Sequence, residues 1–171
     1  MRINAEELLR RYATGERDFA DIKFSARLLD GEDLREINLS GADLIRVDLS
    51  GTNLRNANLS GARLICANLT AANLEGANLF GADLSGADCI GTNFRDADLS
   101  ETILSGTDFT GADLYGVEMD NDSLHYSSGQ KRNFARQENL SFLLKITPIL
   151  IGADLLSLGD DQDSYMVLKI P

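Results

Sequence analysis

The sequence is poor in the residues that most catalytic and metal sites depend on. Its 171 residues include two cysteines and one histidine, too few ligands for a zinc site. The histidine is His125, and no serine or cysteine lies in a recognisable nucleophile setting. A phosphate-binding loop of the Gly-x-x-x-x-Gly-Lys-Ser/Thr type is absent. We therefore expect no enzymatic activity, no catalytic residues, no metal and no cofactor.

Long apolar runs and positive charge are also scarce. No run of about 18 apolar residues occurs, and the N-terminus lacks the basic-then-apolar layout of a signal peptide. We therefore expect a cytoplasmic protein without a membrane partner. The chain has 16 Lys and Arg against 27 Asp and Glu, a net charge of −11. Such a balance disfavours direct binding to nucleic-acid phosphates.

A five-residue repeat runs without interruption through residues 17–126. Every fifth residue from Phe19 to Leu124 is apolar, which makes 22 consecutive pentads. Most central residues are Leu or Phe, and Cys89 and Met119 are the exceptions. The residue two places earlier is mostly Ala, the residue one place earlier is mostly Asp or Asn, and Gly often stands two places later. A short period held over this length predicts a solenoid.

A period of five matches neither an amphipathic helix nor a half-buried strand. It is typical of a short extended segment followed by a turn. The Ala and the central residue share one side of the extended segment, and the small residues turn the chain at a corner.

The pentad Ala82-Asp83-Leu84-Ser85-Gly86 resembles the repeats of bacterial pentapeptide-repeat proteins. The resemblance implies an all-β solenoid, in which four pentads form one coil of a right-handed quadrilateral parallel β-helix. Residues 17–126 would then make about 5.5 coils and a column roughly 26 Å long. The chain's own Leu, Phe and Ala would fill the interior. Cys89 would point inward and Cys66 outward, so we expect no disulfide between them.

Segments at both ends lie outside the repeat. Residues 1–16 are predicted to form a helical cap, with a helix over 4–14 that begins at Asn4 and covers the open end of the solenoid. Residues 127–171 are predicted to be a separate C-terminal segment, with a helix over 138–146 and a strand over 164–170. This segment either caps the column or pairs with another copy, in which case 138–171 would form a homodimer.

Stacking at 20-residue spacing predicts ladders of side chains along the outside of the column. One ladder would contain Asn53, Asn73 and Asn93, whose amides would hydrogen-bond along the stack. Another would place Arg63 between Asp43 and Asp83, where opposite charges offset one another.

The negative charge is concentrated in the second half of the repeat. Residues 17–63 are nearly neutral, whereas residues 64–126 contain one basic residue, Arg95, and 11 acidic residues. These candidate partner-binding residues are Glu75, Asp83, Asp88, Asp96, Asp98, Glu101, Asp108, Asp113, Glu118, Asp120 and Asp122. Either this charge only keeps the protein soluble, or it attracts a basic partner.

Outward-facing apolar residues form a second candidate surface. Ile45 and Ile65 are 20 residues apart and should stack on adjacent coils, with Ile103 further along the same side. Phe80, Ile90 and Tyr115 are also expected to point outward. If such residues are contiguous, they would form a protein-binding patch.

These observations predict a non-enzymatic, rigid module that binds a protein partner, whose identity the sequence does not specify. Two alternatives stay open. In the first, implied by the resemblance to quinolone-resistance proteins of the same family, the acidic rod mimics DNA and binds DNA gyrase. In the second, the C-terminal segment drives self-association and the rod is a structural scaffold.

Overall fold

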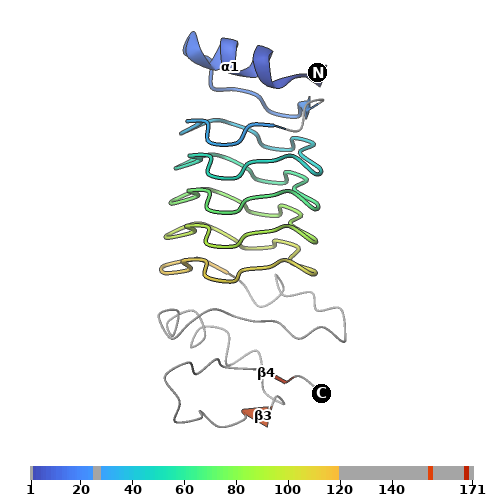
Figure 1. Ribbon diagram of the computed structural model, residues 1–171, viewed down its shortest axis with the longest axis vertical. Coiled ribbons are helices and arrows are strands. Elements are labelled where there is room, and N and C mark those ends of the chain that lie inside the picture. Colours follow the sequence, from blue (N-terminus) through green and yellow to red (C-terminus); the bar gives the residue numbers. More distant parts are fainter. Residues whose placement is uncertain (1, 25–27, 120–153, 156–167, 170–171) are drawn as a thin grey trace.

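The computed structural model describes residues 2–24 and 28–119, together with the short strands 154–155 and 168–169. Within 2–119 the chain winds into a column of stacked coils (Figure 1). The helix expected over 138–146, the acidic residues Asp120 and Asp122, and the proposed dimer contacts of 138–171 lie outside the described residues. In that last region, β3 (Asp154–Leu155) pairs antiparallel with β4 (Leu168–Lys169).

Each coil of the column contains 20 residues. Parallel bridges join residues 20 apart, and they form an unbroken ladder on every side of the column. The backbone hydrogen bonds have the same period: the Phe19 N–H donates to the Asn38 carbonyl at 2.8 Å, and the Asn38 N–H donates to the Arg17 carbonyl at 2.7 Å. One of these ladders consists of Asp18, Asn38, Asn58, Asn78, Asp98 and Glu118. Four pentads therefore make one coil.

A coil has four sides, and each side is one pentad. Face 1 is the stack of pentads centred on residues 19, 39, 59, 79, 99 and 119, and face 2 is centred on 24, 44, 64, 84 and 104. Face 3 is centred on 29, 49, 69, 89 and 109, and face 4 on 34, 54, 74, 94 and 114. Face 1 is therefore opposite face 3, and face 2 is opposite face 4.

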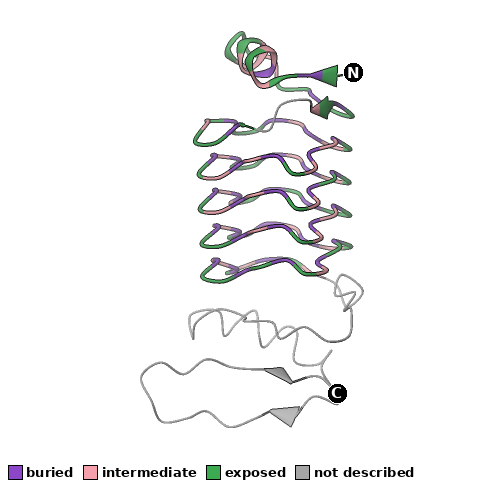
Figure 2. Cartoon of the chain, turned by 45° about the vertical axis from the view of Figure 1, so that its right-hand side comes forward, coloured by how far each residue is buried: buried purple, intermediate pink, exposed green. Residues whose placement is uncertain are grey.

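The interior of the column is filled by the central residues and by the small residues two places before them. Leu39, Leu59 and Leu79 are fully buried, as is Cys89, and Figure 2 shows buried and exposed segments alternating around each coil. Burying one such side chain stabilises the fold by roughly 1.5–3 kcal/mol. Apolar burial repeated in every coil is therefore the main force that holds the stack together.

Buried threonines replace the usual small residue at several interior positions. The Thr52 hydroxyl donates to the Leu29 carbonyl at 2.7 Å, and the Thr92 hydroxyl donates to the Leu69 carbonyl at 2.6 Å. In both cases the acceptor lies 23 residues earlier, on the neighbouring coil. A buried hydroxyl without a partner would be costly, so these bonds explain why the interior tolerates threonine.

The corners between faces require a left-handed backbone conformation, which glycine adopts without strain. Gly51 and Gly91 have φ values of 64° and 63° at one corner. Ala71 stands between them in the same ladder with a φ of 56°, and Cys66 has a φ of 55° at another corner. Residues with a Cβ at these positions are strained.

The N-terminal end of the column is covered by β1 (Arg2–Ile3) and α1 (Ala5–Ala13). β1 pairs in parallel with β2 (Lys23–Phe24) and so adds a further rung to face 2. The Asn4 side chain accepts a hydrogen bond from the Glu7 N–H at 2.9 Å and begins the helix. Leu8 is fully buried. The helix thus shields the apolar end of the stack, as Figure 1 shows.

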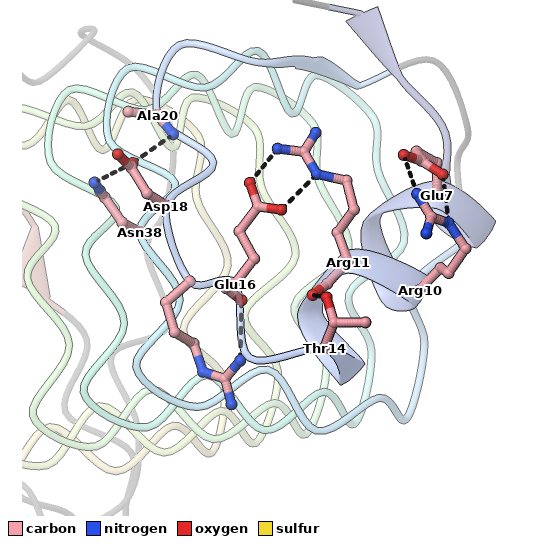
Figure 3. A network of polar contacts seen from close by, with 9 residues as sticks. Glu7, Arg10, Arg11, Thr14, Glu16, Asp18, Ala20 and Asn38 are labelled. Atoms are coloured by element: carbon pink, nitrogen blue, oxygen red, sulfur yellow. Dashed lines mark hydrogen bonds and ion pairs between the residues drawn. The ribbon is translucent and has the colours of Figure 1, made fainter.

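Polar contacts fasten this end (Figure 3). Arg11 forms an ion pair with Glu16, just after the helix, and lowers the pKa of that carboxyl. The Asn38 amide donates to the Asp18 carboxylate at 2.8 Å and links adjacent coils. On the next side, the Tyr12 hydroxyl donates to the Arg35 carbonyl at 2.8 Å. None of the described helices is long and apolar enough to span a membrane.

Candidate interaction surface

The position before each central residue has a structural role that explains its preference for Asp and Asn. Its side-chain oxygen accepts a hydrogen bond from the backbone N–H two residues later. The distance is 3.1 Å from Ser60 to Asn58 and 2.9 Å from Ser100 to Asp98. Because carboxylate and amide oxygens both accept this bond, this hydrogen bond does not distinguish Asp from Asn. The choice between Asp and Asn at this position therefore changes the surface charge while the hydrogen bond is kept.

Amide side chains at this position also bond along the ladder, as the sequence predicts. The Asn93 amide donates to the Asn73 side chain at 3.1 Å, and the Asn68 amide donates to Asp48 at 3.0 Å. An amide links adjacent coils, whereas two stacked carboxylates repel each other. Asp88 stacks on Asp108 in this way.

Most arginines of the repeat are paired with carboxylates on their own face. Arg63 lies 3.3 Å from Asp43, in the ladder predicted from the sequence, and Arg55 lies 2.9 Å from Glu75. Arg35 lies 2.9 Å from Asp33 and lowers the pKa of that carboxyl.

Arg95 is the single basic residue between positions 64 and 126. Its guanidinium lies 3.1 Å from the Asp113 carboxylate and 4.7 Å from the centre of the Tyr115 ring. These three residues lie together on face 4. The acidic residues of faces 1, 2 and 3 between positions 64 and 119 therefore have no basic residue on their own faces within that range.

The charge differs sharply from face to face. Among the described residues, face 1 has one basic and five acidic residues, and face 3 has four acidic residues and no basic one. Face 2 has three basic and two acidic residues, and face 4 has three basic and six acidic residues. Faces 1 and 3 are thus strongly negative and lie on opposite sides of the column. Face 2 is the one described face on which basic residues outnumber acidic ones.

The structure distributes the predicted acidic residues over all four faces rather than gathering them into one patch. Face 4 holds Glu75, Asp96 and Asp113, and face 2 holds Asp83. The remaining described members occupy faces 1 and 3 near the C-terminal end of the column; they are Asp88, Asp98, Glu101, Asp108 and Glu118. These five residues are defined here as the acidic pair of walls.

The predicted apolar residues are only partly brought together. Ile45 and Ile65 occupy the same position on adjacent coils of face 2, where both are half-buried. Ile103 lies on the same face, with 38% of its surface exposed, but in the ladder before the central residues. The other exposed apolar residues are on separate faces: Phe80 on face 1, Ile90 on face 3 and Tyr115 on face 4.

The two cysteines are placed as the repeat predicts. Cys89 is buried among the central residues, Cys66 is exposed at a corner, and both are free thiols. Burial raises the pKa of the Cys89 thiol, and the carboxylates of Asp88 and Asp108 raise it further. Among the described residues no group of three or more His, Cys, Asp and Glu is arranged to hold a metal ion.

The difference between the faces is a feature that the sequence analysis missed. The 20-residue spacing predicted individual ladders, but charge was summed only along the chain, where neighbouring pentads from different faces are mixed. Summing the charge of each face over the stacked coils would have revealed the pattern.

Comparison with known proteins agrees with this architecture. A family model described as pentapeptide repeats matches eight copies over residues 18–56, 42–79 and 77–116. A similar solved structure is HetL, a pentapeptide repeat protein involved in heterocyst differentiation regulation from the cyanobacterium Nostoc sp. Strain PCC 7120. It has 34% sequence identity and a TM-score of 0.53, and the match covers 63% of this chain and 49% of HetL. The match thus spans about half of HetL.

Two further structures are similar over comparable lengths. Rfr23, a pentapeptide repeat protein from the cyanobacterium Cyanothece 51142, has 33% identity and a TM-score of 0.44, and the match covers 61% of each chain. Full-length QnrB1, a plasmid-mediated fluoroquinolone resistance protein, has 25% identity and a TM-score of 0.25, again with 61% of each chain covered. No curated protein matches the chain by sequence.

Proposed function

The chain belongs to the pentapeptide repeat family, whose fold is the right-handed quadrilateral β-helix, and from this premise we propose that it is a non-enzymatic binding module for a basic protein. The observation that supports this proposal most directly is the acidic pair of walls. Its carboxylates lie on two opposite faces, and neither face carries a basic residue between positions 64 and 119. A surface of one sign attracts partners of the opposite sign and speeds their association.

The geometry favours a partner that can hold the column from both sides. A basic groove or a pair of basic lobes would contact faces 1 and 3 at the same time, whereas a flat basic surface would contact one of them. The interior is filled by the chain's own side chains, so recognition takes place on the outside. We propose the cytoplasm as the compartment where this binding occurs.

The binding surface can be tested by removing charge without removing hydrogen bonds. The proposed variant carries Asn in place of Asp88, Asp98 and Asp108, because Asn accepts the same backbone N–H. A control variant carries Asn in place of Asp30, Asp33 and Asp48, which removes equal charge from the first coils. Both variants and the parent chain are immobilised and exposed to lysate of the source cell. Captured proteins are then identified by mass spectrometry.

We expect basic proteins to be captured by the parent chain and by the control variant, and to be lost from the first variant. The same proteins should be released at about 0.5 M salt, where the Debye length falls to a few ångströms. Equal capture by the parent chain and the first variant would contradict the proposal.

A more specific version is that the partner is DNA gyrase, bound by mimicry of DNA. Two rows of negative charge on opposite sides of a rod are the feature that favours it, since duplex DNA also presents two negatively charged strands. The purified chain would then inhibit DNA supercoiling by gyrase, and the Asn variant of the acidic walls would not. An unaffected supercoiling reaction would eliminate gyrase as the partner and leave the general proposal standing.

A further inference from the structure

The ladder before the central residues of face 2 contains a row of alternating charge. From the N-terminal end the members of the ladder are Arg2, Lys23, Asp43, Arg63, Asp83 and Ile103, and parallel pairing joins each to the next. From Lys23 to Asp83 the signs are positive, negative, positive, negative. Lys23 and Arg63 are exposed, and Asp43 and Asp83 are partly exposed, so the alternating row is accessible from outside.

An alternating row of four charges is complementary to itself when it is reversed. Two copies can pack with face 2 against face 2 when a two-fold axis relates them. This axis lies in the plane of the interface and is perpendicular to both columns. The axis passes between the coils of Asp43 and Arg63. Asp43 then meets Arg63 of the other copy, and Lys23 meets Asp83 of the other copy. All four rungs place opposite charges together.

The same two-fold axis also brings the outward isoleucines together. Ile45 and Ile65 occupy one position on adjacent coils of face 2, on the other side of the central residue from the charged row. Rotation places Ile45 of one copy against Ile65 of the other. The centre of the interface would thus be apolar, with a charged row beside it, an arrangement typical of protein interfaces.

The remaining faces are unsuited to pairing with themselves. Faces 1, 3 and 4 each carry an excess of at least three negative charges among the described residues, so two copies would repel each other there. Face 2 has no such excess. In a chain with a net charge of −11, it is the described face on which two copies can approach at the lowest electrostatic cost.

From these observations we propose that face 2 is a self-association surface, on which a second copy of the chain binds with its column antiparallel to the first. The surface is small. Five rungs about 4.8 Å apart give a height of roughly 20 Å, and a pentad spans at most about 16 Å. A stable interface buries about 800 Å² on each partner. The dimer is therefore weak and forms at high protein concentration.

Charge reversal tests the proposal with the full-length chain. Arg63→Asp and Asp43→Arg each turn two attractive contacts of the dimer into two repulsive ones. In sedimentation equilibrium, each variant alone should show a dissociation constant at least about tenfold higher than the parent chain. Circular dichroism should show that both variants stay folded, because an exposed ion pair contributes little to stability.

Mixing the two variants distinguishes a contact between copies from a contact within one chain. In an equimolar mixture, every rung of the mixed pair again joins opposite charges, so association should return to at least the parent level. The matched control is Arg55→Asp, which breaks the Arg55–Glu75 ion pair on the opposite face with the same change in charge. It should leave association unchanged.

Three results would overturn the proposal. The first is a parent chain that stays monomeric at millimolar concentration. The second is a dimer that both single variants form as well as the parent chain, which would place the contact elsewhere, for example in 138–171. The third is a mixture of the two variants that associates no better than each variant alone.

Discussion

The residue before each central residue accepts a backbone hydrogen bond that either Asp or Asn can accept, so its charge can vary. At Asp88 the side chain accepts the Ile90 N–H at 3.2 Å, and an Asn in its place would accept the same bond. The neighbouring carboxylate in the stack is Asp108, and like charges directly opposite each other on adjacent strands are destabilising. The negative charge of Asp88 therefore lowers the stability of the fold, and the hydrogen bond does not depend on that charge.

Substitution at Asp88 separates these two effects. Asp88→Asn should leave the free energy of unfolding unchanged or raise it by up to about 1 kcal/mol, because the bond is kept and the repulsion is removed. Asp88→Ala should lower it by about 0.5–1.5 kcal/mol, the usual net contribution of a hydrogen bond. Urea denaturation measures both. If the two variants were equally stable, the hydrogen bond would not be the reason for Asp or Asn here.

Backbone strain at the corners gives a second residue-scale prediction. Ala71 has a left-handed φ of 56°, which costs a residue with a Cβ about 1–2 kcal/mol. Ala71→Gly should therefore raise the free energy of unfolding by about 1 kcal/mol. Gly91→Ala, one coil further along the same corner, has open space for its Cβ and should lower stability by a similar amount. A lower free energy of unfolding for Ala71→Gly than for the parent chain would show that the corner is not strained.

At the scale of elements, α1 packs on the column through Leu8, with Leu9 and Tyr12 partly buried beside it. Leu8 is fully buried, and Leu8→Ala should lower the free energy of unfolding by about 2–5 kcal/mol. Glu6, on the exposed side of the same helix, is the control, and Glu6→Ala should change it by less than about 0.5 kcal/mol. Thermal denaturation of the two variants tests whether the helix is part of the cooperative unit. Equal melting temperatures would mean that α1 contributes nothing to the column.

The four faces are the other elements, and each combines one pentad from every coil. Because a face gathers residues 20 apart, its charge cannot be seen in any short window of sequence. The opposite signs of face 2 and of faces 1 and 3 arise in this way. The two proposals made above use different faces, so binding of a basic partner and self-association are independent of each other.

At the scale of the whole molecule, excess negative charge near one end should make stability depend on salt. Raising the ionic strength from about 0.01 to 0.3 M shortens the Debye length from about 30 Å to less than 10 Å and screens the repulsion between stacked carboxylates. The parent chain should become more resistant to urea over this range. The variant with Asn at Asp88, Asp98 and Asp108 should show a smaller increase. Equal slopes for the two chains would show that this repulsion is not significant.

The sequence predicted the repeat architecture well because the rule is local and uniform. An uninterrupted period of five forces every central residue, Cys89 included, to the same side of the chain, and one coil then determines the next. The stacking of Asn73 with Asn93 and of Asp43 with Arg63 followed from arithmetic on residue numbers. The candidate sites were less predictable, because exposure and ion pairing depend on neighbours from three coils at once.

By itself, the sequence determined the five-residue step, the inward and outward positions, the helix that begins at Asn4 and the uneven charge along the chain. Only the tertiary structure showed how the charges of each face add up and which of them form pairs. It placed five of the acidic residues on two opposite faces, paired Arg95 with Asp113 and Tyr115, and added Lys23 to the row of Asp43, Arg63 and Asp83. The physical reason is that hydrogen bonding between coils brings together residues 20 positions apart, while consecutive pentads turn through a corner and point in different directions.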